Sequence, residues 1–117
     1  MAKERAKIRE ISIVQSKGAF SIFKPGASKN YSYEDVSSLR QVLSNEKARI
    51  LNTIKAQNPA SIYDLAKKLG RSFKAVNDDT KLLKKFGFID LKEEQFKGRK
   101  RLRPVIVVDT LNIWVKL

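Results

Sequence analysis

The chain has 117 residues, 42% of them hydrophobic and 32% charged, with a formal net charge of +13 at pH 7. This length is typical of one domain with its own core. The sequence contains no cysteine and no histidine, which excludes disulfides and thiolate metal sites and removes the commonest general base at neutral pH. Its carboxylates stand singly or as sequence neighbours, which do not converge on one point. We therefore expect no enzyme, no metal site and no cofactor.

The basic excess is spread along the whole chain and indicates a polyanionic partner, without saying which one. No apolar run approaches the roughly 18–20 residues that a membrane span needs. The first residues are polar and lack the apolar stretch of a secretory signal. We expect a cytoplasmic, nucleoid-associated protein without membrane contact.

Residues 1–30 have the pattern of a β-hairpin followed by a loop. Apolar residues partly alternate over Lys7–Val14, and Ala19–Phe23 is the expected partner strand. Pro25–Asn30 is rich in turn-forming residues. We expect this segment to be an appendage used for dimerisation or an accessory partner contact, and residues 31–117 to form the main domain.

Helical spacing dominates the middle of the chain. One helix is predicted over about 34–43, and a second begins after Ser44 and ends at Asn58-Pro59. The strongest amphipathic pattern starts at Ser61, where apolar residues fall at i, i+3, i+4 and i+7. Gly70 is suited to end that helix in the left-handed conformation.

Ser72 is the predicted cap of a further helix, which ends near Gly87 and whose inward face is Val76, Thr80 and Leu83. Only Arg71 and Ser72 separate Gly70 from this helix. A connection this short makes the two helices cross steeply, which is the helix-turn-helix geometry.

The C-terminal third is predicted to be β-structure. Phe88–Lys92 and Val105–Val108 are expected to pair on either side of a basic loop at 97–103, with Gly98 at the hairpin tip. Leu111–Leu117 alternates as one more half-buried strand. Trp114 projects opposite to the apolar side chains of that strand, so it is either covered by the N-terminal hairpin or part of a subunit contact.

The order of these parts favours double-stranded DNA as the partner. The outward face of the helix from Ser72 carries Asn, Lys and Ala side chains. Asn can bind adenine, Lys can bind guanine or phosphate, and Ala can contact a thymine methyl group. The basic loop can clamp phosphates or enter a minor groove. A solvated helix face and a solvated loop are the alternatives. The predicted DNA-binding residues are Ser61, Tyr63, Arg71, Ser72, Lys74, Ala75, Asn77, Lys81, Lys97, Arg99, Lys100, Arg101 and Arg103.

Two acids on the same helix require a structural explanation, because carboxylates are repelled by phosphates. Asp78 has Lys74 four residues before it and Lys81 three residues after it, which predicts an ion pair on the helix surface. Asp79 lies toward the junction between helix and sheet, and we expect it to meet an arginine from elsewhere.

From Ser44 to Leu117 the chain resembles winged helix-turn-helix transcriptional regulators of bacteria and archaea, in the broad MarR/ArsR-like group. The resemblance rests on Ser61-Ile62-Tyr63-Asp64-Leu65-Ala66, Leu69-Gly70-Arg71, Val76 through Asp79, Leu82-Leu83, Gly87-Phe88-Ile89, Gly98-Arg99-Lys100-Arg101 and Pro104. It implies an α+β winged helix-turn-helix fold, here with an added N-terminal β-hairpin and a C-terminal β-strand. It also implies a recognition helix over about 72–86, a basic wing at 97–103 and a homodimer on palindromic operators.

The resulting functional hypothesis is a sequence-specific DNA-binding regulator acting as a repressor. Residues 1–30 do not match the long dimerisation helix of many MarR-type proteins, so the mode of dimerisation is open. Metal-sensing relatives use Cys and His ligands, which this chain lacks. The alternatives are a low-specificity architectural or plasmid-maintenance DNA binder, and a winged-helix adaptor that binds RNA or protein.

Overall fold

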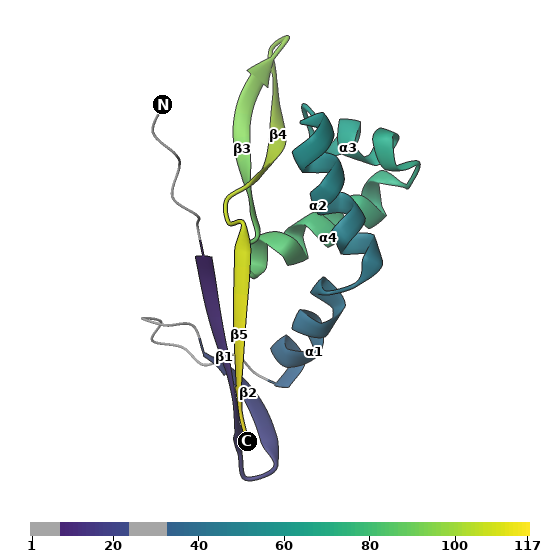
Figure 1. Cartoon of the computed structure of the whole chain (residues 1–117). Coiled ribbons are helices and arrows are strands. Elements are labelled where there is room, and N and C mark those ends of the chain that lie inside the picture. The colour runs from purple at the N-terminus through teal and green to yellow at the C-terminus, as the bar shows by residue number, and fades with distance from the viewer. Residues whose placement is uncertain (1–7, 24–32) are drawn as a thin grey trace, which may run out of the picture. The chain divides into compact units, whose positions relative to one another are not determined.

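The computed structural model describes residues 8–23 and 33–117, which form an α+β fold (Figure 1). The elements are β1 (Ile8–Ser16), β2 (Ala19–Phe23), α1 (Tyr33–Val42), α2 (Asn45–Gln57), α3 (Ile62–Leu69), α4 (Phe73–Lys85), β3 (Ile89–Phe96), β4 (Arg99–Ile106) and β5 (Thr110–Lys116). They divide into two compact units. The first unit contains β1, β2, nearly all of α1 and β5, and the second spans Val42–Val107.

The sheet of the first unit has the strand order β2-β1-β5. β1 and β2 form the predicted hairpin, with Ile13 opposite Ile22. β5 pairs with β1 in parallel, which aligns Ile11 with Ile113. Parallel strands need a long connection, and here the whole second unit lies between them in the sequence. Ile11 and Ile22 are fully buried.

β5 therefore departs from the expected division of the chain at residue 30. The last strand pairs with the N-terminal hairpin and not with the β3–β4 hairpin that precedes it in the chain. The reason is tertiary: alternation predicts a strand but not its partner. Trp114 is 63% exposed, which excludes the first of the two alternatives for this side chain, cover by the N-terminal hairpin.

The three helices of the second unit begin and end where the sequence predicts. The Ser44, Ser61 and Ser72 hydroxyls accept hydrogen bonds from the backbone N–H groups of Lys47, Asp64 and Ala75, respectively. Asn58 and Gly70 end α2 and α3 in the left-handed conformation. These caps satisfy N–H and C=O groups that the helix ends leave unpaired. The core of the unit includes the fully buried Ile50, Leu65, Val76, Leu83 and Phe86.

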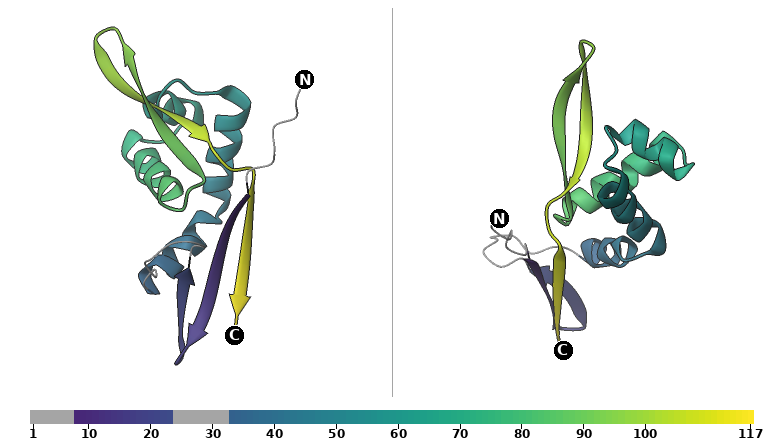
Figure 2. Two further views of the ribbon diagram at one scale, coloured as in Figure 1. Left: turned by 90° about the vertical axis from the view of Figure 1, so that its left-hand side faces the viewer. Right: turned by 45° about the horizontal axis from the view of Figure 1, so that its top comes forward.

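β3 and β4 form an antiparallel hairpin from the Ile89–Ile106 pair to the Phe96–Arg99 pair. Its turn is only Lys97-Gly98, both at positive φ (50° and 76°), a turn whose twist matches that of the strands. The prediction of a basic loop at 97–103 is therefore wrong, because pairing continues to the turn and places Arg99–Arg103 on β4. Figure 2 shows this hairpin extending past the helices of its own unit.

Candidate functional site

A cleft of about 950 Å³ lies in the second unit, between the N-terminal ends of α3 and α4 and the β3–β4 hairpin. This volume falls within the roughly 300–1,000 Å³ typical of ligand sites. The cleft is lined by Ser61, Ile62, Tyr63, Phe73, Asn77, Glu93, Phe96, Lys97, Arg99, Lys100, Arg101 and Leu102. It thus brings together seven of the predicted site residues, from three elements and the hairpin turn.

Two aromatic clusters line this cleft. On the helical side, the ring centroids of Tyr63 and Phe73 are 6.4 Å apart, and the rings are tilted by 41°. On the hairpin side, the Arg101 guanidinium carbon is 4.1 Å from the Phe96 ring centroid, and Lys97 Nζ is 5.3 Å from it. Tyr63, Phe73 and Phe96 remain 63%, 48% and 47% exposed. The cleft therefore offers open aromatic surface beside positive charge.

The cations at the hairpin turn differ in their pairing from the one farther along β4. Lys97, Arg99 and Lys100 are exposed and form no ion pair within the described part of the chain. Arg103 does not line the cleft: its Nε donates to Glu94 Oε1 at 2.8 Å, and its Nη1 lies 3.5 Å from Asn58 Oδ1. Arg103, one of the five basic residues predicted to bind DNA at 97–103, thus forms an ion pair with Glu94 within the protein.

The predicted outward face of α4 is accessible. Lys74 and Lys81 are exposed, while Ala75 and Asn77 are half-buried. Lys74 Nζ pairs with Asp78 Oδ2 at 3.0 Å, which confirms the predicted surface ion pair. The Asn77 side chain lines the cleft, and its backbone carbonyl accepts a 2.9 Å hydrogen bond from the Thr80 hydroxyl.

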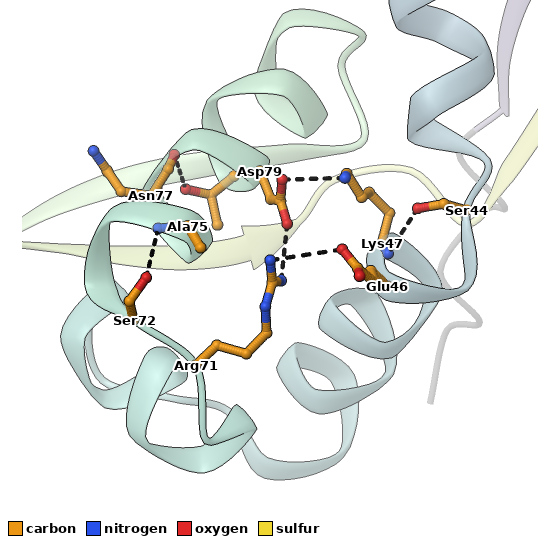
Figure 3. A network of polar contacts seen from close by, with 9 residues as sticks. Ser44, Glu46, Lys47, Arg71, Ser72, Ala75, Asn77 and Asp79 are labelled. Carbon is orange, nitrogen blue, oxygen red and sulfur yellow. Dashed lines mark hydrogen bonds and ion pairs between the residues drawn. The ribbon is translucent and has the colours of Figure 1, made fainter.

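Asp79 is the centre of an ion-pair network that ties α2 to α4 (Figure 3). Its carboxylate lies 2.8 Å from Arg71 Nη1 and 3.1 Å from Lys47 Nζ. Arg71 Nη2 is also 3.6 Å from Glu46 Oε2. The predicted arginine partner of Asp79 is therefore confirmed and is Arg71. Because two cations neutralise it, the Asp79 carboxylate is not an unpaired negative charge on α4.

Sequence reasoning missed several of these residues. Lys47 lies on the same helical stripe as Ile50 and Ile54, at i, i+3 and i+7, and this spacing is the signal that it is buried. Phe96 stands next to the basic segment, but the strand was predicted to end at Lys92. Three of the predicted DNA-binding residues have structural partners within the protein. The hydroxyls of Ser61 and Ser72 cap helices, and the Arg71 guanidinium binds carboxylates.

Asp64 stabilises the start of α3. The backbone N–H of Ala60 donates to Asp64 Oδ2 at 2.9 Å, and Lys68 Nζ lies 3.1 Å from Oδ1. The hydrogen bond from Ala60, followed by that from Lys68, lowers the pKa of the Asp64 carboxyl below its ordinary value of 3.8. These two contacts therefore stabilise the ionised carboxylate at the N-terminal end of α3.

A family model, HVO_A0114, matches residues 42–113, which is more than half of the chain. The chain belongs to the HVO_A0114 family. The match includes the whole second unit, and therefore both the cleft and the Asp79 network, but not β1 or β2. No curated protein matches the chain.

Two structural features are absent from the described residues of this HVO_A0114 family member. None of its helices is long and apolar enough to cross a membrane. Within residues 8–23 and 33–117, no three His, Cys, Asp or Glu side chains are grouped to hold a metal ion. The described surface of the second unit does carry the basic, aromatic cleft, which Asn77 of α4 also lines.

Proposed function

We propose that this HVO_A0114 family member is a winged helix-turn-helix regulator that binds double-stranded DNA. In this proposal α3 and α4 are the helix-turn-helix, α4 is the recognition helix, and the β3–β4 hairpin is the wing. The observation that carries it is that Asn77, from the outward face of α4, and the cationic hairpin turn line one cleft. Residues 42–107 also contain 16 lysines and arginines against seven acids, a charge suited to a polyanion.

The proposed contacts follow from which groups are accessible. Lys74 and Lys81 reach guanine or phosphate, Asn77 reaches an adenine edge, and Ala75 permits close approach. Lys97, Arg99 and Lys100 at the hairpin turn bind phosphates on either side of a groove. Base reading is thus assigned to α4 and sequence-independent affinity to the hairpin.

The Asp79 network has a positioning role in this proposal. Arg71 and Lys47 hold α4 against α2 through the Asp79 carboxylate. They also neutralise an acid that would otherwise repel phosphates. Arg71 was predicted to bind DNA directly; with its guanidinium on two carboxylates, we assign it to orientation of the recognition helix.

The remaining parts of the hypothesis are a homodimer and repression. A two-fold dimer would place two α4 helices in major grooves about 34–36 Å apart, and would require a palindromic operator. Selection of bound duplexes from a random pool, with light scattering of the complex, reports half-site symmetry and stoichiometry together. A selected site without symmetry, or one chain per duplex, would contradict the dimer.

Salt dependence tests the DNA-binding surface. The logarithm of affinity should fall with the logarithm of salt concentration by about 0.9 per neutralised phosphate. Replacing Lys97, Arg99, Lys100 and Arg101 with Ala should therefore reduce the slope by about two to four. A matched control removes four exposed cations elsewhere, namely Arg49, Lys55, Lys84 and Lys116. Equal slopes for the two variants would contradict the assigned surface.

Sequence reading is tested separately. Asn77→Ala should change the preferred sequence more than the salt slope. Equal affinity of the unmodified protein for random duplexes would instead favour the architectural alternative. Tighter binding to RNA than to duplex DNA would overturn the proposal in favour of the adaptor.

A further inference from the structure

We propose that the cleft between α3, α4 and the β3–β4 hairpin holds one unstacked nucleobase of bound DNA, together with its phosphate. This inference rests on the proposed function and deepens it, since major-groove reading by α4 does not require such a pocket. It predicts a preference for DNA in which one base is already outside the stack. The chemistry recognised is that of a single nucleotide.

The aromatic clusters supply the surface on which a base can stack. Tyr63 and Phe73 line the helical side, and Phe96 lines the hairpin side with the Arg101 guanidinium carbon 4.1 Å from its ring centroid. Proteins that bind single-stranded nucleic acid stack bases on aromatic rings and on guanidinium planes. Tyr63, Phe73 and Phe96 are each about half exposed or more as residues, so these side chains are accessible to a ligand.

The cations define where the phosphate lies. Lys97, Arg99 and Lys100 line the same cleft as the rings. A purely apolar ligand would leave these charges without a counter-ion, whereas a nucleotide matches both the rings and the cations.

Glu93 selects among bases. Glu93 lines a cleft that is otherwise rich in cations. Its carboxylate would repel a phosphate oxygen. A carboxylate accepts hydrogen bonds from an exocyclic amino group such as cytosine N4. The cleft therefore favours an amino-bearing base over thymine.

The test compares duplexes of one sequence that carry a single bulged cytosine, a bulged abasic residue or no bulge. Competition fluorescence anisotropy measures their dissociation constants for the full-length chain. The cytosine bulge should bind about 10-fold more tightly than the abasic bulge, as expected for one stacked base. The abasic bulge controls for the bend and flexibility that any bulge introduces.

Two variants locate the effect. Phe96→Leu should remove most of the cytosine preference, and Phe20→Leu, an exposed phenylalanine of the first unit, should retain it. Glu93→Gln should reduce discrimination between a bulged cytosine and a bulged thymine. An intact-duplex affinity that Phe96→Leu leaves unchanged would show that the variant is folded and still binds DNA.

The outcomes separate this inference from the proposed function. Equal affinity for cytosine and abasic bulges, with tight binding of the intact duplex, would overturn the cleft proposal alone. Failure to bind any duplex would overturn the proposed function. Cytidine monophosphate is tested as a competitor: displacement of the bulged duplex at micromolar concentration would assign the cleft to a free nucleotide and overturn the assignment to DNA.

Discussion

Two groups of cations in the second unit have opposite surroundings. Lys47 and Arg71 both contact Asp79, and their side chains are only 11% and 26% exposed. Lys97, Arg99 and Lys100 are exposed at the β3–β4 turn, without an ion pair in the described structure. The same residue types thus hold helices together in one region and present charge in the other.

The difference shows that basic composition does not by itself mark a binding surface. A cation near a carboxylate in a desolvated setting is constrained by that partner, and removing either member exposes the other to an unfavourable environment. A cation in solvent makes little contribution to folding. We therefore expect substitutions in the first group to change stability and substitutions in the second to change binding.

Asp79→Ala should produce the largest effect on stability. It leaves Lys47 and Arg71 without their shared carboxylate, and we expect a loss of about 2 kcal/mol, below the roughly 3–5 kcal/mol of a fully buried pair. Urea unfolding followed by circular dichroism measures the loss. The variant with four alanines at 97, 99, 100 and 101 should unfold at nearly the unmodified urea concentration. A similar loss in both variants would remove the distinction between the two groups.

Gly98→Ala should have a smaller effect on stability, of about 1 kcal/mol, because an L-residue at φ of 76° is strained although its Cβ would meet no neighbour. Gly18→Ala is the matched control, since Gly18 occupies the equivalent Lys-Gly turn of β1–β2 at φ of 83°. Both variants should lose similar stability, but only Gly98→Ala should weaken DNA binding. Equal binding by the two variants would argue against a role for the hairpin turn.

Asp64 should make the stability of the second unit depend on pH in the acidic range. Its folded pKa is lowered by the Ala60 N–H and then by Lys68. Its contribution to stability is therefore present above its ordinary pKa of 3.8 and is lost as pH falls through that value toward the lowered one. Urea midpoints at pH 7, 4 and 3 should fall less steeply in Asp64→Asn. Parallel pH profiles would contradict this role.

Lys74→Ala should have the smallest effect on stability. Its ion pair with Asp78 is an exposed i, i+4 pair, with the lysine side chain 87% exposed, and such pairs contribute at most about 0.3–0.5 kcal/mol. Under the proposed function, the loss in the free energy of DNA binding should exceed the loss in the free energy of unfolding. A large stability loss without a change in affinity would place Lys74 with the structural cations.

Local patterns allowed much of the second unit to be predicted from sequence. The bounds and buried faces of the helices were predicted by the serine caps, by Gly70 and by the stripe of Val76, Thr80 and Leu83. Capping and helical spacing act within a few residues of the chain. Adjacent strands around Gly98 predicted a hairpin for the same reason. The length of that hairpin was missed, because polar residues such as Glu93–Gln95 carry no strand signal of their own.

The sequence by itself therefore determined the helices, their caps, the existence of both hairpins and the basic character of the chain. Only the tertiary structure decided that β5 pairs with β1, that Asp79 takes Arg71 and Lys47, and that Phe96 shares a cleft with Tyr63 and Phe73. The reason is physical. Caps and periodicity depend on near neighbours in the chain, whereas a strand partner, a buried ion pair and a cleft depend on segments that only packing brings together.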